Sequence, residues 1–184
     1  MKLIVLCTLL ACFVFGTEPS IYDFKVNALQ RDNTQINFSD FKGKKILIVN
    51  TASKSPYTFQ MEELEKLYRA YRDKLVIVGF PAGADFGDQE LKSNREIRDF
   101  CTFTYDITFP MAEKVTTVGE MRHPIFSYLI SEAKKMAMDD PVIKWNFTKF
   151  LLDENGKLIK VFPADVTPLS TEVTSYLNNT RGWQ

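Results

Sequence analysis

The chain has 184 residues, of which 45% are hydrophobic and 25% are charged, as is typical of a single globular domain. Lysine plus arginine and aspartate plus glutamate balance at 23 each, so the formal net charge is zero. A neutral chain without a basic tract gives no electrostatic basis for binding nucleic acid or an anionic membrane surface. The sequence also shows no metal-ligand cluster, P-loop or dinucleotide fingerprint, so we expect no metal.

The N-terminal segment is typical of a secretory signal peptide. Lys2 precedes an almost purely apolar run over residues 3–15, and the small residue Gly16 follows it. The run is too short to span a bilayer comfortably, which favours a cleaved signal over an uncleaved membrane anchor. We therefore expect residues 1–16 to be removed. Residues 17–184 should form one domain, secreted or in the lumen of the secretory pathway, with no stable membrane anchor.

Removal of the signal changes what the cysteines and the glycosylation sequons can do. Cys7 and Cys12 lie in the signal, so only Cys101 remains and the mature chain can form no internal disulfide. In a secreted chain the sequons become candidate glycosylation sites. We favour Asn37 and Asn178 over Asn146, because Asn146 lies in an apolar run that resembles a buried strand.

The first part of the mature chain predicts a β-hairpin followed by a central strand. Residues 21–29 alternate roughly as a strand does, and residues 35–38 can form the return strand. One helical turn is expected over residues 39–43, before the apolar strand at residues 45–50.

The segment after the central strand predicts a helix and then a second buried strand. Ser55 before Pro56 is a favourable N-cap followed by a favourable first helical residue, and apolar residues recur at helical spacing over residues 58–72. The short, β-branched run at residues 75–80 suits a parallel strand that is buried on both faces. Together these elements predict a parallel βαβ unit.

The rest of the chain predicts further helices and a second hairpin. Ser93 and Glu96 form a capping box that opens a helix over residues 94–103. The later elements are expected to be an extended segment (105–111), a helix opened by His123-Pro124 and running to Lys135, a strand (142–152), a turn (154–156), a strand (157–162) and a helix (168–177). This order predicts an α/β sandwich with a mixed sheet.

The junction between the central strand and the first long helix is a candidate chemical site. The free N–H groups and the dipole of a helix N-terminus favour an anion and lower the pKa of a thiol placed there. In this chain that position carries a hydroxyl, Ser55.

Several motifs, in order, resemble those of the glutathione peroxidase family over residues 21–177. They are Val49-Asn50-Thr51-Ala52-Ser53-Lys54, Phe80-Pro81, Phe86-Gly87 with Gln89-Glu90, Ser93-Asn94 with Glu96-Ile97, Phe109-Pro110, His123-Pro124 and Trp145-Asn146-Phe147-Thr148-Lys149-Phe150. The last of these is highly specific to the family. The resemblance implies a thioredoxin-like α/β fold, with a central mixed β-sheet flanked by helices and an N-terminal β-hairpin. It also implies thiol-dependent reduction of hydrogen peroxide and organic hydroperoxides, as a response to oxidative stress.

The resemblance also implies where the family's four-residue site falls. The peroxidatic cysteine or selenocysteine position is occupied by Ser55. Aligned backwards from Phe86, the glutamine position is occupied by Asp85. The tryptophan and the asparagine are retained as Trp145 and Asn146. No cofactor is implied, and glutathione or thioredoxin would be the co-substrate of an active enzyme.

The two changed positions weaken the family's chemistry. A serine hydroxyl is not redox active, and its activation needs a neighbouring general base. Asp85 could accept a proton from Ser55, but its charge would oppose an anion at the site. The alternative roles are a helix N-cap for Ser55, a solvated loop residue for Asp85, and packing for Trp145 and Asn146.

Cys101 falls where thioredoxin-dependent members of the family carry their resolving cysteine. No peroxidatic partner remains for it in the mature chain. It is either a small apolar residue in a helix or a free thiol that forms mixed disulfides or slowly reduces peroxide.

Our first expectation is a secreted family member whose peroxidase activity is lost or much reduced, a pseudoenzyme. Two alternatives stay open. One is an active peroxidase that uses Cys101 or a non-standard site, with a peroxide and a thiol reductant as partners. The other is a non-catalytic protein that binds a ligand or partner through Trp145, Asn146 and Asp85. The short connection at residues 136–141 resembles that of monomeric members, so we expect a monomer.

Overall fold

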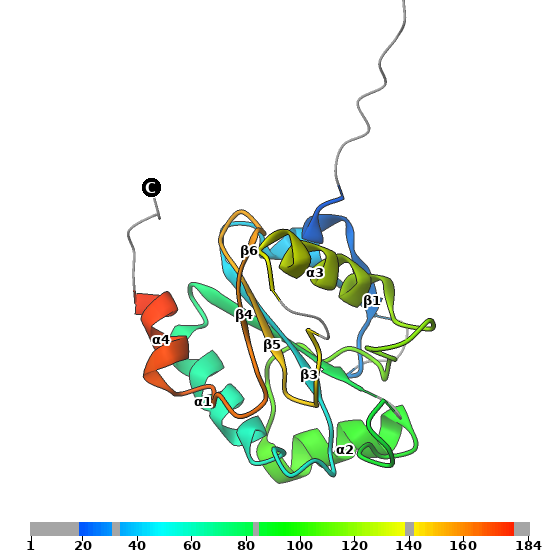
Figure 1. Ribbon diagram of the computed structural model, residues 1–184. Helices are drawn as coiled ribbons and strands as arrows, with labels where there is room; N and C mark the ends of the chain where they lie inside the picture. Colours follow the sequence, from blue (N-terminus) through cyan, green and yellow to red (C-terminus); the bar gives the residue numbers. More distant parts are fainter. Residues whose placement is uncertain (1–18, 31–33, 83–84, 139–141, 179–184) are drawn as a thin grey trace, which may run out of the picture.

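The computed structural model describes residues 19–30, 34–82, 85–138 and 142–178 (Figure 1). The predicted signal peptide and the turn at residues 31–33 lie outside these ranges. The elements, in chain order, are the 3₁₀ turn η1 (Ile21–Asp23), β1 (Lys25–Asn27), β2 (Gln35–Asn37), the 3₁₀ turn η2 (Phe38–Phe41), β3 (Lys45–Thr51), α1 (Gln60–Tyr71), β4 (Leu75–Pro81), α2 (Asn94–Tyr105), α3 (Pro124–Lys135), β5 (Lys149–Leu152), β6 (Leu158–Phe162) and α4 (Thr171–Asn178).

A mixed four-stranded sheet in the order β4-β3-β5-β6 forms the centre of the molecule (Figure 1). β3 and β4 are parallel, β5 is antiparallel to β3, and β6 is antiparallel to β5. β1 and β2 form a separate antiparallel hairpin. The predictions of an α/β fold with a mixed central sheet, flanking helices and an N-terminal hairpin are therefore confirmed.

Helices cover both faces of this sheet, so β3 and β4 are buried along their whole length and are mostly apolar. Ile46 and Ile48 pack with α3 and the N-terminal hairpin in one hydrophobic cluster. Leu47 and Val49 pack with α1, α2 and α4 in a second cluster on the other face. Alternate residues of one strand thus enter opposite layers of the core.

The first predicted strand is shorter than expected, because a capping box forms a turn before it. The Ser20 hydroxyl accepts a hydrogen bond from the Tyr22 N–H, and the Asp23 carboxylate accepts one from the Ser20 N–H. These bonds hold Ile21–Asp23 as a 3₁₀ turn, and the strand is confined to Lys25–Asn27. The alternation over residues 21–29 did not distinguish a turn from a strand.

The predicted strand at residues 142–152 is also wrong over most of its length. Only Lys149–Leu152 is a strand, and a turn precedes it in which Phe147 has φ +66°. Positive φ is uncommon for a bulky residue and ends regular strand geometry. The last helix likewise begins at Thr171 rather than at Pro168, with the Ser170 hydroxyl accepting from the Val173 N–H.

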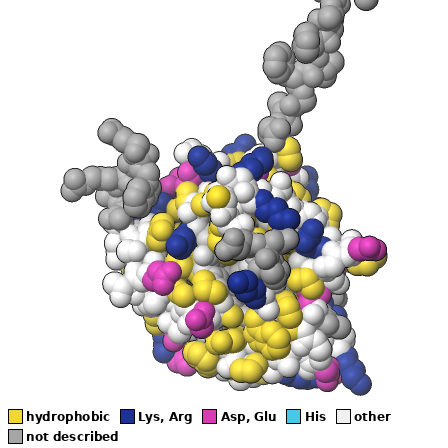
Figure 2. Space-filling model, viewed as in Figure 1, with side chains coloured by type: hydrophobic (Ala, Val, Ile, Leu, Met, Phe, Trp, Pro, Cys, Tyr) yellow, Lys and Arg dark blue, Asp and Glu magenta, His cyan; other side chains and the backbone are white. Residues whose placement is uncertain are grey.

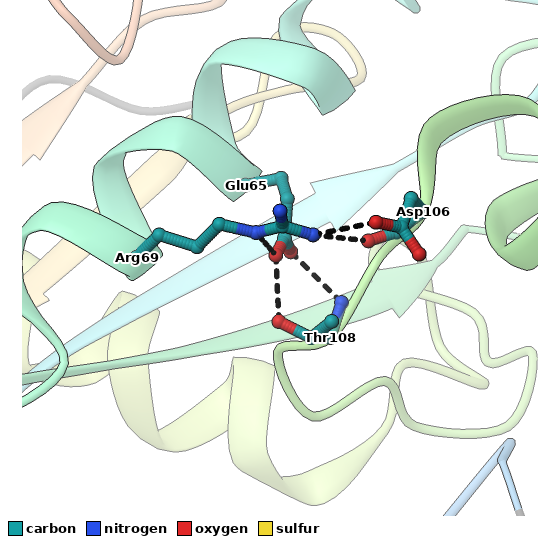
Figure 3. A network of polar contacts seen from close by, with 4 residues as sticks. All are labelled: Glu65, Arg69, Asp106 and Thr108. Carbon is teal, nitrogen blue, oxygen red and sulfur yellow. Dashed lines mark hydrogen bonds and ion pairs between the residues drawn. The ribbon is translucent and has the colours of Figure 1, made fainter.

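The capping box of α2 is confirmed, and a buried carboxylate fixes the other end of this helix (Figure 3). Glu65 of α1 is 5% exposed. Its oxygens accept from the Thr108 N–H (2.8 Å), the Thr108 hydroxyl (2.6 Å) and the Arg69 Nε–H (2.6 Å). Arg69 also pairs with Asp106, the left-handed residue that ends α2. This network joins α1 to the end of the helix that carries Cys101.

Glu65→Gln should lower the free energy of unfolding by about 1–3 kcal/mol, because an amide NH₂ would face donors that now find a carboxylate oxygen. The matched control is Glu62→Gln on the same helix. The Glu62–Lys66 ion pair is 64% and 60% exposed at its two side chains, so its loss should cost less than about 1 kcal/mol. Urea unfolding of both variants measures the difference, and equal effects would contradict a special role for Glu65.

Candidate functional site

Three segments meet at one edge of the sheet because of the strand directions. The parallel strands β3 and β4 end side by side, with Thr51 in register with Pro81. β5 runs the other way and starts at Lys149, opposite Val49. The residues after β3, after β4 and before β5 therefore converge, near α2 at the bottom of Figure 1. Figure 2 shows hydrophobic side chains gathered on the lower part of the same view.

Ser55, the residue predicted to occupy the nucleophile position, lies in a turn before α1 and is 6% exposed. Its Oγ accepts a hydrogen bond from the Tyr57 N–H at 3.2 Å. Its carbonyl accepts from the Thr58 N–H (3.0 Å) and the Thr58 hydroxyl (2.6 Å). Further bonds that span three residues lead into α1, which begins at Gln60. Ser55 thus caps this turn, and the prediction that the helix itself starts at Ser55-Pro56 is wrong.

Asp85, the residue predicted to occupy the glutamine position, is hydrogen-bonded to the loop that carries Thr117. Its Oδ2 accepts from both the N–H and the hydroxyl of Thr117, each at 2.5 Å. Burial raises the pKa of Asp85, and the bonds from Thr117 oppose that rise. Thr117 is fully buried. The Asp85 carboxylate therefore joins the loop after β4 to the loop that carries Thr117. In the described part of the chain, no hydrogen bond joins it to Ser55.

Trp145 and Asn146 lie in the turn before β5, next to the segment that carries Asp85. The Trp145 ring packs on Phe86 with the ring centroids 5.2 Å apart. Asn146 is only 1% exposed, and its Nδ2 has no hydrogen-bond partner among the described residues. A buried unpaired donor is uncommon and costly in a folded protein. The structure thus brings Trp145 and Asn146 together with the loop after β4.

Asn50, the penultimate residue of β3, holds this turn. Its Nδ2 donates to the Trp145 carbonyl (3.2 Å), and its Oδ1 accepts from the Thr148 N–H (2.8 Å). Its own carbonyl accepts from the Phe147 N–H at 2.6 Å. Asn50 belongs to one of the family motifs in the sequence, but the motif alone predicts no role for it. A polar residue at the end of an otherwise apolar strand was the signal that could have identified it.

The loop after β4 is also bound to the segment that leads to Ser55. The Lys54 N–H donates to the Gln89 carbonyl at 2.8 Å, and the Ser53 N–H donates to the Glu90 carboxylate at 3.1 Å. Lys54 and Asp88 form an exposed ion pair at 3.0 Å. The backbone around Ser55 is thereby fixed from the side of β4.

Cys101 lies on the inner face of α2 and is 4% exposed. With Thr51, Ala52, Ser53 and Glu90, it lines a small space too narrow for a water molecule. Burial, and then the nearby Glu90 carboxylate, raise the pKa of the Cys101 thiol to about 12. An activated cysteine needs the opposite environment, partly exposed and electropositive. The surroundings therefore match those of a small apolar core residue.

The candidate glycosylation sites differ in exposure. Asn178 is exposed, and its Oδ1 accepts from the Tyr71 hydroxyl at 3.0 Å. Asn37 is half-buried at the end of β2, whereas Asn146 is buried. Within the described ranges we find no group of side chains suited to a metal ion. No helix there has the length and apolar character to cross a membrane.

Comparison with known proteins identifies the family. Residues 21–130 match the family described as glutathione peroxidase. A glutathione peroxidase of Lactococcus lactis subsp. cremoris is 42% identical over 154 residues, which are 83% of this chain and 95% of that protein. The apo crystal structure of Trgpx superposes with a TM-score of 0.65 at 31% identity and covers 88% of this chain and 97% of its own.

A more distant structure shows the wider fold class. A thiol:disulfide interchange protein of the thioredoxin family from Chlorobium tepidum has a TM-score of 0.57 at 16% identity. It covers 84% of this chain and 89% of its own, and at this identity it supports the fold alone. The fold is thus thioredoxin-like, and the chain belongs to the glutathione peroxidase family.

Proposed function

We propose that this protein is a secreted member of the family whose peroxidase activity is lost or much reduced. The observation that carries the proposal is the hydroxyl of Ser55 at the nucleophile position. Its only side-chain hydrogen bond among the described residues is the one accepted from Tyr57. Peroxide reduction needs a thiolate or selenolate that attacks the O–O bond and is itself oxidised, and a serine cannot be oxidised in this way.

Among the described residues, no general base is hydrogen-bonded to the Ser55 hydroxyl. Asp85 is engaged with Thr117, as described above. His123, the chain's one histidine, accepts from the Ile125 N–H through Nδ1 and packs on the Phe80 ring. Burial lowers the pKa of His123. Activation of a serine requires a base within hydrogen-bond reach, so we also expect no catalysis in which Ser55 acts as the nucleophile.

The retained half of the site favours a scaffold that has kept its shape. Asn50 still fixes the turn of Trp145 and Asn146. The unpaired Nδ2 of buried Asn146 is an observation in favour of a second candidate function, namely binding of a small polar molecule through an acceptor atom. Because the scaffold has kept its shape, it should support peroxide reduction once a thiol is introduced at position 55.

Secretion is supported by the sequence of the N-terminal segment, in which Lys2 precedes an apolar run at residues 3–15 and Gly16 follows it. We expect the protein to be a monomer, glycosylated at Asn37 or Asn178 rather than at buried Asn146.

Expression of the full chain in eukaryotic cells tests this part of the proposal. The medium should contain a protein that begins at Thr17, and its mass should fall on enzymatic removal of N-linked glycans. A protein retained in the cytosol with Met1 or Lys2 at its N-terminus would contradict secretion. Recovery in the medium without a glycan would contradict only the modification.

Ser55→Cys should raise peroxidase activity at least tenfold over the unaltered chain, because a thiol at this position restores the redox-active nucleophile. Reduction of hydrogen peroxide and of a lipid hydroperoxide is measured with glutathione and with thioredoxin in turn. Ser55→Ala is the matched control and should stay at the background rate. If Ser55→Cys folds and remains at background, the scaffold has lost more than its nucleophile.

The alternative peroxidase based on Cys101 is tested by alkylation. With a pKa near 12, very little thiolate exists at pH 8, and the fraction grows as pH rises towards 12. Iodoacetamide should therefore modify Cys101 of the folded mature chain at least 100-fold more slowly than that of the urea-unfolded chain. Fast alkylation at pH 8, or a peroxidase rate that disappears in Cys101→Ser, would establish Cys101 as the reactive group.

A further inference from the structure

A buried cation lies directly behind the turn of Trp145 and Asn146. Lys149, the first residue of β5, is 0% exposed. Its Nζ donates to the carbonyl oxygens of Phe147 (2.7 Å), Pro163 (3.4 Å) and Ala164 (3.4 Å). Burial lowers the pKa of Lys149 to about 7, and the more distant carboxylates of Asp165 and Glu63 oppose that change.

The shortest of these bonds goes to the most unusual residue of the turn. Phe147 is fully buried and has φ +66°, a left-handed conformation that is strained for a residue with a bulky side chain. The Asn50 carbonyl holds its N–H at 2.6 Å, and the Lys149 ammonium holds its carbonyl. The peptide groups before and after Phe147 are therefore both held in place, the first by the backbone of Asn50 and the second by the side chain of Lys149.

The two longer bonds join Lys149 to the segment after β6, and this segment is also bound to α1. The Ala164 carbonyl also accepts from Nε2 of Gln60 at 2.7 Å. Gln60 is fully buried and is the first residue of α1, directly after the turn of Ser55. Lys149 and Gln60 thus share one acceptor in the segment after β6, and they link the start of α1 to the start of β5.

A stabilising ion pair does not account for this lysine. Moving an ammonium out of water costs several kcal/mol, and buried charges are often replaced by apolar residues without loss of stability. No carboxylate of the described residues lies within ion-pair distance of Lys149, while three backbone carbonyls surround it. The ammonium places several N–H donors at one point. This arrangement is better suited to holding one backbone conformation than to raising the overall stability of the protein.

We propose that Lys149, assisted by Gln60 through the shared Ala164 carbonyl, is a positioning residue that sets the orientation of Trp145 and Asn146. The proposal concerns the geometry of the turn, and it rests on the proposed function only for what that turn would bind. Lys149 acts through the Phe147 carbonyl and has no contact of its own with a ligand.

The test uses Trp145 as its own reporter. Trp183→Phe leaves Trp145 as the chain's single tryptophan. In this background Lys149→Met replaces the ammonium by an apolar side chain of similar length, and Lys157→Met, at an exposed position near the start of β6, is the matched control. We expect Lys149→Met to raise the acrylamide quenching constant of Trp145 at least twofold and to reduce its near-UV circular dichroism. The control should leave both unchanged.

Unchanged quenching and circular dichroism in folded Lys149→Met would overturn the proposal. If that variant does not fold, Lys149→Gln, which keeps an N–H donor, takes its place and should give an intermediate quenching constant. Failure of both variants to fold would make Lys149 a requirement of the whole sheet, and this too would overturn the assignment to the turn.

A second measurement separates this proposal from the proposed function. Lys149→Met in the Ser55→Cys background should lower the restored peroxidase rate at least tenfold, with Lys157→Met again unchanged. If Ser55→Cys alone has no rate, the proposed function fails, and the fluorescence of Trp145 still decides the role of Lys149.

Discussion

The pairing of β3 with a parallel strand on one side and an antiparallel strand on the other determines the rest of the site. Because β4 and β3 end together and β5 begins there, three loops must share one edge of the sheet. Asn50, near the end of β3, then bonds the turn before β5 through four groups: its backbone N–H, its carbonyl and both polar atoms of its side chain. Burial of β3 on both faces makes this edge rigid, since the strand cannot shift without moving residues of both hydrophobic clusters.

On this rigid frame, the chemistry depends on a few side chains. Trp145 and Asn146 are held as a pair, with a donor that no described residue satisfies. Ser55 supplies a hydroxyl at the position that we predict for the nucleophile, where the family reaction needs a redox-active atom. Asp85 bonds a neighbouring loop instead of the nucleophile position, so its negative charge is already matched by the donors of Thr117. Under the proposed function, the binding groups of a peroxidase scaffold remain in this chain and the reacting group is absent.

Much of the fold could be predicted from local patterns. The apolar runs of β3 and β4, the helical spacing of α1, the Ser93–Glu96 capping box and the His123-Pro124 start of α3 each follow from short-range chemistry. The errors arose where side chains bond the backbone in competition with regular structure. Ser20 and Asp23 formed a turn inside an alternating run, and Asn50 and Lys149 held Phe147 in a conformation that no strand pattern predicts.

The site was only partly predictable for the same reason. Family motifs predict site positions for Ser55, Asp85, Trp145 and Asn146. The partner of Asp85, however, is Thr117, 32 positions away in the sequence, and spacing alone gives no sign of this contact. The burial of Cys101 likewise depends on packing between α2 and the end of β3.

The most direct test of lost peroxidase chemistry is a single-turnover measurement on the unaltered mature chain. One equivalent of hydroperoxide is added without reductant, and both the remaining peroxide and the intact protein mass are followed for the first minute. This is short enough to precede slow oxidation of exposed methionines such as Met121, which is 84% exposed. The account predicts no consumption of peroxide and no gain of an oxygen atom. Rapid consumption of one equivalent, with one oxygen on the protein or on Cys101, would contradict it.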